Sequence, residues 1–261
     1  MLYVKALPGG AHMRIKFSES YCLLQILTLK AELASLPNVK LGTLRGKQVV
    51  RVYTRENNRL VFITHFADST EGLRLSGTAQ RRIEIRNEIK RLEQRLGKRM
   101  SGMLDRLCVR LSSCILNESV WNECQSNENT MKNNGNYCHK GIQMRSRVEV
   151  LIAEILDELG LQYKYEPAVR FGEEVYYPDF LVYLPCLKRC LIIEFFGMSD
   201  EEKYVFKMLG KLTVYSNNGL IMNRDVIGLY GTRDVMVSSD YIYNNIVTII
   251  NLLAAEAVQL K

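Results

Sequence analysis

Residues 175–197 decide the fold, and they read VYYPDFLVYLPCLKRCLIIEFFG. This stretch holds two apolar runs, each with the length of a buried strand. Each run carries one acid, Asp179 at the head of the first and Glu194 inside the second. A buried ionised carboxylate costs several kcal/mol of desolvation unless a cation pairs with it. The placement therefore predicts a cation beside both acids, and a metal ion is the first candidate.

The spacing of the two acids is compatible with a shared metal ion. If the two runs pair as a hairpin, Asp179 and Glu194 approach each other across the ladder and can share a hard divalent cation, Mg²⁺ or Mn²⁺. Such an ion activates a water molecule and polarises a phosphodiester. The alternative, two surface acids at strand ends, fits poorly with their apolar flanks. A metal site is the prediction.

The charge of the chain is unevenly distributed. Its 261 residues are 47% hydrophobic and 24% charged, which is typical of a folded globular protein. The formal net charge is +7, made up of +11 in residues 1–100 and −4 in residues 101–261. This asymmetry favours a phosphate-binding N-terminal region attached to an acidic, metal-using body. A solvated basic face is the alternative.

The pattern along the chain predicts a basic N-terminal region over 1–121, an Asn-rich linker over 122–143 and a core over 144–261. In the N-terminal region we expect a helix over 18–36, a three-stranded meander over 38–66, a long helix over 78–100 and a weaker helix over 103–116. The long helix has a narrow apolar stripe, and its charged flanks suit either packing with a solvated face or groove binding. The candidate nucleic-acid-binding residues are Arg45, Lys47, Arg51, Arg55, Arg81 and Arg82.

The core region has a regular order of predicted elements. A helix capped by Ser146 ends at Gly160, and strands follow over 161–169, 174–184 and 189–196. A second helix from residue 199 to about 215 precedes a strand over 225–231 and a closing helix over 240–257. The order α, β, β, β, α, β predicts an α/β fold with a mixed sheet.

This order, with Pro-Asp on one strand and an acid on the next, resembles the PD-(D/E)XK restriction-endonuclease-like superfamily. The segments MRSRVEVLIAEILDELGLQYKYE (144–166), YYPDF (176–180) and EFFGMSDEEKYVFKMLGKLTVYSNNGLI (194–221) are similar to a very-short-patch-repair-like nuclease domain of bacterial and phage proteins. The resemblance covers roughly residues 144–255. It implies a metal-dependent DNA endonuclease, a hydrolase of phosphodiester bonds.

The resemblance also implies roles for single residues. Asp179 and Glu194 become the metal-binding acids, and Glu149 becomes a helical glutamate that supports the metal. Glu149 also stands three residues after Ser146, the spacing of a capping box, and the two roles are compatible. The lysine of the Glu-X-Lys motif would fall at Phe196, and its neighbour is Phe195. Neither ring can donate a proton or hold charge.

A replacement lysine is expected from the helix that follows. Lys203, Lys207 and Lys211 recur every four residues and so share one helix face. Lys211 lies closest to the apolar stripe of this helix, so we expect it to reach the acids, with Lys207 in reserve. A solvated lysine edge is the alternative for each of them.

Other classes of function and partner follow from the remaining patterns. The alternative to a nuclease is a catalytically inactive nuclease-like module that binds nucleic acid or a protein. No stacking-aromatic pattern of an RNA-binding sheet is evident, so DNA is favoured over RNA. Seven cysteines, an odd number, do not suggest a disulfide framework, and no apolar run reaches membrane-spanning length. We therefore expect a cytoplasmic protein. A concerted double-strand break requires a second protomer, so a homodimer is a further hypothesis.

Overall fold

A computed structural model describes residues 14–56, 59–101, 107–111, 113–129, 137–232 and 237–260. These residues form a mixed α/β structure with several sheets and six α-helices. The chain divides into two compact units. The N-terminal unit is built from residues 19–108, and the C-terminal unit from residues 109–259 together with the described residues before Glu19. In the chain, β4 (Leu107–Val109) falls at the boundary, inside the stretch 103–116 for which a helix is predicted; the described residues of that stretch contain no helix, so the prediction is wrong for them.

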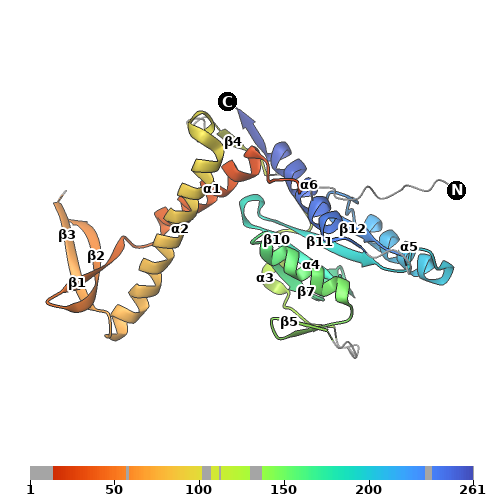
Figure 1. Ribbon diagram of the computed structural model, residues 1–261, viewed down its shortest axis with the longest axis horizontal. Coiled ribbons are helices and arrows are strands. Elements are labelled where there is room, and N and C mark those ends of the chain that lie inside the picture. The colour runs from red at the N-terminus through yellow and green to blue at the C-terminus, as the bar shows by residue number, and fades with distance from the viewer. Residues whose placement is uncertain are drawn as a thin grey trace, which may run out of the picture. The chain divides into compact units, whose positions relative to one another are not determined.

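The N-terminal unit is an antiparallel meander accompanied by two helices (Figure 1). Its elements are α1 (Glu19–Ser35), β1 (Val39–Leu44), β2 (Lys47–Glu56), β3 (Arg59–Phe66) and α2 (Thr70–Ser101). The helix and the meander predicted at the start of the chain are both present. The long helix starts at Thr70 rather than at residue 78, because the Ser69 hydroxyl accepts a hydrogen bond from the Gly72 amide and caps it.

The apolar stripe of α2 is buried, as its spacing predicts. Its members are Ile85, Ile89, Leu92 and Leu96, and each is at most 8% exposed. Nearer the start of the helix, Leu75 and Ala79 pack with Val39 and Val50 of the sheet. One side of α2 therefore supports the meander with its first turns, and α2 also packs against α1. Most charged residues around the stripe remain on the outer side, and Arg82 is the buried exception among those described.

Two glycines in α2 give a matched test of this packing. A methyl group at Gly72 would lie 1.9 Å from the carbonyl oxygen of Phe66, whereas one at Gly77 would meet nothing within 4 Å. We expect Gly72→Ala to destabilise the protein by about 1–3 kcal/mol, because a backbone atom must move. Gly77→Ala should stabilise it by up to about 1 kcal/mol through helix propensity. Denaturant unfolding of the two variants measures both, and equal effects would contradict the close approach.

The C-terminal unit carries a four-stranded sheet with helices and short hairpins around it. Its helices are α3 (Glu118–Glu123), α4 (Arg147–Glu158), the short 3₁₀ turn η2 (Pro185–Leu187), α5 (Glu202–Asn217) and α6 (Ser239–Ala257). Its strands are β5 (Tyr137–His139), β6 (Ile142–Met144), β7 (Gln162–Tyr165), β8 (Val169–Phe171), β9 (Glu174–Tyr176), β10 (Phe180–Leu184), β11 (Arg189–Phe196), β12 (Val226–Tyr230) and β13 (Val258–Leu260).

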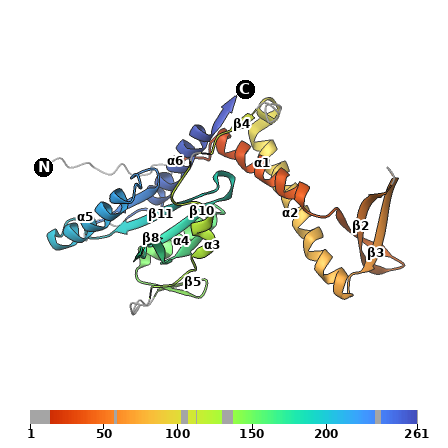
Figure 2. The ribbon, with the colours of Figure 1, turned by 180° about the vertical axis from the view of Figure 1, so that it is seen from behind.

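The sheet has the order β12-β11-β10-β7. β7, β10 and β11 are antiparallel neighbours, while β12 runs parallel to β11 after the α5 crossover. Figure 2, seen from behind, shows β11 with α5 following it in the chain. The predicted order α, β, β, β, α, β is found when the β8–β9 hairpin is set aside. The mixed sheet predicted from the sequence is therefore present.

Two of the predicted strands are shorter in the structure than the sequence indicates. The strand expected over 161–169 is divided between β7 and β8, and the one expected over 174–184 between β9 and β10. The first break lies at Glu166, whose backbone has a φ of +40° and which precedes a proline. The second lies at Pro178, which offers no amide to a ladder. The freed segments β8 and β9 pair with each other around Gly172, which has a φ of +63°.

Both faces of β10 and β11 are covered. Every residue of β10 is buried, and only Phe195 of β11 is not. On one face Leu181, Ile192 and Val226 form a core with Tyr215 of α5. The two-sided burial explains why the runs are almost continuously apolar instead of alternating. A charged side chain on these strands has no solvent face to reach, and the two that occur, Arg189 and Glu194, are each buried and paired with an opposite charge.

The stretch expected to be a linker, residues 122–143, is hydrogen-bonded into the C-terminal unit wherever it is described. The amides of Asn127 and Glu128 donate to the carbonyls of Tyr165 and Glu166. The Glu128 carboxylate in turn accepts from the amides of Gln125 and Ala168. Residues 130–136 of the predicted linker lie outside the described residues. Residues 124–129 therefore form a bound loop that supports the end of β7, and the rest of the described stretch includes the end of α3, the strand β5 and the start of β6, so the prediction of a linker is wrong for these residues.

Candidate active site

The two acids named from the sequence lie opposite each other at one end of the sheet. Phe180 pairs with Ile193 in the antiparallel β10–β11 ladder, so the register places Asp179 across from Glu194. Residues opposite each other in such a ladder project to the same face. Asp179 is fixed there because its Oδ2 accepts a 2.7 Å hydrogen bond from the Phe195 amide. The hairpin that the sequence predicts for these strands is confirmed.

Helix α5 supplies the cation. The Nζ of Lys211 lies 2.5 Å from Oε2 of Glu194 and 3.4 Å from the carbonyl oxygen of Tyr177. Four residues further along the helix, the Tyr215 hydroxyl donates to Oε1 of Glu194. Lys207 and Lys203 are exposed on the outer side. The expectation that Lys211 reaches the acids therefore matches its position, and Lys207, the reserve, points away from them.

Burial dominates the electrostatics of this cluster. Glu194 is 1% exposed, and burial raises the pKa of its carboxyl, with the charge of Lys211 opposing the shift. Burial and the nearby charge of Glu194 raise the pKa of Asp179 well above its usual range. For Lys211, burial acts to lower the pKa, but the charges of Glu194 and Asp179 outweigh it and the pKa is raised. The lysine is thus held as a cation between two acids.

Glu149 lies outside this cluster and acts as a cap. Its Oε2 accepts from the amide of Arg145 and from the Tyr165 hydroxyl, both at 2.8 Å. Its Oε1 accepts from the Ser146 hydroxyl at 3.0 Å, and Ser146 accepts in return from the Glu149 amide. Ser146 therefore caps α4, and the Glu149 carboxylate reaches back to the Arg145 amide and the Ser146 hydroxyl in place of the Ser146 amide of a standard capping box. Within the described ranges, no three His, Cys, Asp or Glu side chains gather closely enough to hold a metal, so the predicted trio of Asp179, Glu194 and Glu149 is not assembled.

The remaining donors suit a divalent cation of the Mg²⁺ type. Asp179 is partly exposed, and only its Oδ2 is hydrogen-bonded within the described part of the chain. Carboxylate oxygens are the hard ligands that Mg²⁺ and Mn²⁺ prefer, and Mg²⁺ commonly uses one or two of them while it keeps several waters. Asp179 with Glu194 is therefore a sufficient donor pair. Lys211 competes with a metal for Glu194.

The two phenylalanines after Glu194 have structural roles. Phe196 is 3% exposed, and its ring stacks on Tyr230 of the neighbouring strand with 5.4 Å between centroids. Phe195 packs against Gly197: a methyl group on Gly197 would lie 2.7 Å from the Phe195 ring. The position expected for the Glu-X-Lys lysine is thus part of the core. Any cation at this site has to come from another element, and α5 provides one.

The cations named for nucleic-acid binding divide into two groups. Arg45 and Lys47 are exposed in and after the β1–β2 turn, and Arg51 and Arg55 follow on β2. By contrast, Arg82 is only 7% exposed, and its guanidinium donates to the carbonyls of Leu33 and Leu36 at the end of α1. It caps a helix and has no free face for a phosphate, so we remove it from the nucleic-acid-binding set.

Arg81, next to it, makes two hydrogen bonds to the Glu32 carboxylate, at 2.8 and 2.9 Å. A guanidinium that is already matched by a carboxylate attracts a phosphate weakly. The prediction that Arg81 and Arg82 bind nucleic acid is thus not supported, because each already has a partner in α1 or just after it. These partners could not be seen in the sequence. The strand cations remain candidates.

Sequence reasoning missed two groups that hold the site. Tyr215 follows Lys211 at i+4 on the same helix face, and this spacing was the available signal. Arg145 forms an ion pair of 2.5 Å with Glu166, whose amide donates to the carbonyl oxygen of Asp179. Asn129 adds a hydrogen bond of 3.2 Å to Glu166. Nothing in the sequence separates this ion pair from an exposed one.

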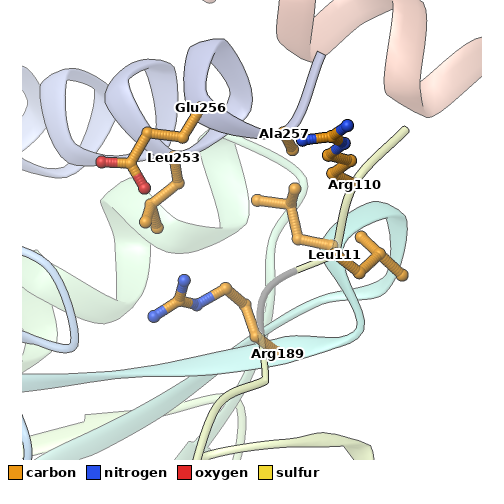
Figure 3. A pocket seen from close by; sticks show the side chains of 7 residues that line it. Arg110, Leu111, Arg189, Leu253, Glu256 and Ala257 are labelled. Carbon is orange, nitrogen blue, oxygen red and sulfur yellow. The ribbon is translucent and has the colours of Figure 1, made fainter. Parts of the chain in front are cut away.

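A cavity of about 340 Å³ in the C-terminal unit is a separate feature (Figure 3). Arg189, from the first position of β11, and Glu256, from α6, are among the residues that line it. Glu194 is five positions further along β11 than Arg189, a distance of about 16 Å along a strand. The Arg189 guanidinium is also paired with Asp225. This cavity is therefore not part of the acid cluster.

Comparisons of the chain with protein-family models, with curated proteins and with solved structures find no match. Its function is thus argued from its own residues. Among the described residues, none of the helices combines the length and the apolar character needed to cross a membrane.

The raised pKa of Asp179 predicts a pH-dependent cost of the site. Between the ordinary aspartate pKa of about 4 and the raised value, the folded protein binds more protons than the unfolded chain, so stability falls as pH rises through this window. Asp179→Asn cannot lose a proton. In metal-free buffer it should melt at a higher temperature than the wild type at pH 8, and this difference should shrink toward pH 4.

Thermal unfolding followed by circular dichroism across this pH range measures the effect. Glu154→Gln, which neutralises an exposed acid on α4, is the matched control and should leave the profile of the wild type unchanged. A gain for Asp179→Asn that is the same at pH 4 and pH 8 would contradict the assigned pKa direction.

Proposed function

We propose that the C-terminal unit is a metal-dependent DNA endonuclease with a PD-(D/E)XK-like core. The observation that carries the proposal is the convergence of Asp179, Glu194 and Lys211 at one end of the mixed sheet. Two acids and a lysine at this place are what the sequence resemblance implies. The lysine arrives from α5, since position 196 is a core phenylalanine. Burying three charges together is costly, which favours a functional reason for keeping them.

The chain's own residues have defined parts in this proposal. Asp179 and Glu194 hold Mg²⁺ or Mn²⁺, which when bound supplies an activated water and polarises the scissile phosphodiester. Lys211 is kept cationic by the acids and offers positive charge where a phosphate oxygen gains negative charge. Tyr215 positions Glu194 by holding Oε1, and the Phe195 amide positions Asp179. The neighbouring apolar strands exclude bulk water from the inner side of the cluster.

A specific observation favours a second candidate, a nuclease-like module without catalysis. Both oxygens of Glu194 already accept hydrogen bonds, one from Lys211 and one from Tyr215. In this arrangement the Lys211–Glu194 ion pair would occupy the place of a metal ion and have only a structural role. Such a protein would bind nucleic acid or a partner protein and cut nothing. The two candidates differ in one measurable property, which is divalent-metal-dependent hydrolysis.

Cleavage of plasmid and of single-stranded DNA by the purified chain, with Mg²⁺ or Mn²⁺, tests the proposal. We expect Asp179→Ala and Glu194→Ala to abolish cleavage, because each removes a metal ligand. Lys211→Ala should lower the rate by about 100-fold or more, since it removes a preorganised charge. Lys207→Ala, on the same helix but exposed, is the matched control and should stay within about twofold of the wild type.

Two controls keep the outcome interpretable. Removing one partner of a buried ion pair costs about 3–5 kcal/mol, so the folded fraction of each variant is measured by circular dichroism at the assay temperature. The double variant Lys211→Met with Glu194→Gln leaves neither charge and should fold better than Lys211→Ala alone. If folded wild-type protein cuts no DNA with either metal, the endonuclease proposal is wrong and the inactive module takes its place.

A further inference from the structure

The meander of the N-terminal unit has one face that is basic and aromatic. The β1–β2 and β2–β3 registers put Lys40 opposite Arg51, and Tyr53 opposite Phe62. Side chains at alternate positions share a face. The residues of this face, here called the cationic sheet face, are Lys40, Gly42, Leu44, Lys47, Val49, Arg51, Tyr53, Arg55, Leu60, Phe62, Thr64 and Phe66. It contains four cations, three aromatic rings and no acid.

The rings of this face are accessible and lie next to cations. Phe62 is 57% exposed and Phe66 is 49% exposed. The Tyr53 and Phe62 rings are neighbours, with centroids 5.6 Å apart. The Arg51 guanidinium lies 5.9 Å from the centroid of Phe62 and the Lys47 ammonium 5.7 Å from that of Phe66. Large exposed rings are unfavourable in water, so this surface calls for a partner.

The four cations of this face lack carboxylate partners, as Arg86 and Lys90 of α2 also do among the described residues. Within the described residues, Lys40, Lys47, Arg51 and Arg55 take part in no ion pair with a carboxylate. Helix cations of the same unit do, in the pairs Arg74–Glu71, Arg81–Glu32, Arg91–Glu88 and Lys30–Glu93. What distinguishes the sheet cations is that they stand beside exposed rings.

We propose that the cationic sheet face binds single-stranded DNA, with bases stacked on Phe62, Phe66 and Tyr53 and phosphates held by the four cations. Stacking needs an open base face, and in a duplex both faces of each base are covered by neighbouring base pairs. A duplex would use the cations and leave the rings against a polar backbone. The combination of accessible rings and unmatched cations therefore fits a single strand better than a double helix.

This inference goes beyond the proposed nuclease, because binding by the sheet requires no cleavage. It rests on the proposed function in one respect, the choice of DNA over RNA. The sequence shows no stacking-aromatic pattern of an RNA-binding sheet, whereas the aligned strands form a ring cluster, so the choice of DNA rests on the nuclease resemblance alone. The rings are spread over β2 and β3, and they come together only when the strands are aligned.

Fluorescence anisotropy with the full-length protein in EDTA tests the inference without cleavage. The probes are a twenty-nucleotide thymidine oligomer, a duplex of the same length and a uridine oligomer. We expect the thymidine oligomer to bind most tightly, with a logarithmic salt dependence of about −3 for four phosphate contacts. Phe62→Ala should weaken its binding about 5- to 150-fold, the range of one lost base stack.

Matched variants separate stacking from other causes. Ile63 is the next residue of β3, is 60% exposed and projects to the opposite face, so Ile63→Ala should leave binding unchanged. Phe62→Leu keeps an apolar side chain but no ring, and should bind as weakly as Phe62→Ala. Phe62→Tyr should retain binding. Thermal unfolding checks that all four variants are folded.

Four results would overturn the inference. The duplex binding as tightly as the single strand would assign the face to phosphate contacts alone. Equal losses for Phe62→Ala and Ile63→Ala, or full binding by Phe62→Leu, would remove the stacking role. Tighter binding of the uridine oligomer would replace DNA by RNA. Because EDTA prevents metal-dependent cutting, each of these outcomes is independent of whether the acid cluster is a nuclease.

Discussion

The buried carboxylate of Glu194 is the constraint on which the C-terminal unit depends. A charge that is 1% exposed inside a sheet covered on both faces has to be matched, and Lys211 and Tyr215 of α5 match it. Loss of one partner of a buried ion pair costs about 3–5 kcal/mol, comparable with the total stability of many domains. These two contacts therefore fix the rotation of α5 about its axis. The same contacts hold Lys211 beside Asp179.

The acid cluster is a poor solution for stability alone. An apolar group at position 194 would pack against the same core without a desolvation penalty, and Asp179 adds a second charge that raises the cost. Proteins tolerate such arrangements at sites that use them. The supporting groups lead to the same conclusion. The amide of Glu166 binds the backbone carbonyl of Asp179, and Glu166 is itself held by the Arg145 ion pair and by the bound loop at 125–129. The site is built with more structure than a lone ion pair requires.

The N-terminal unit shows that equal residue types have different fates. Three arginines on α2, namely Arg74, Arg81 and Arg91, are paired with helix carboxylates, and Arg82 is bound by the carbonyls at the end of α1. Arginines and lysines on the meander have no such partners among the described residues and stand beside exposed rings. A count of basic residues therefore overstates the charge that is available to a nucleic acid.

The sequence by itself determined the elements and the pairing of the acids. Two apolar runs of strand length, each with a single acid, suggested the β10–β11 hairpin. Helical spacing favoured Lys211 over Lys207. These features are local, because periodicity fixes which side of an element a residue occupies. The breaks at Glu166 and Pro178 shortened the predicted strands, since backbone conformation at one residue overrides an apolar pattern.

The partners of Glu149, Arg81 and Arg82 were decided only by the tertiary structure. Each of them is bound by atoms from another element, and so is the ring cluster on the meander. Contacts between residues distant in the chain leave no spacing in the sequence from which they can be predicted.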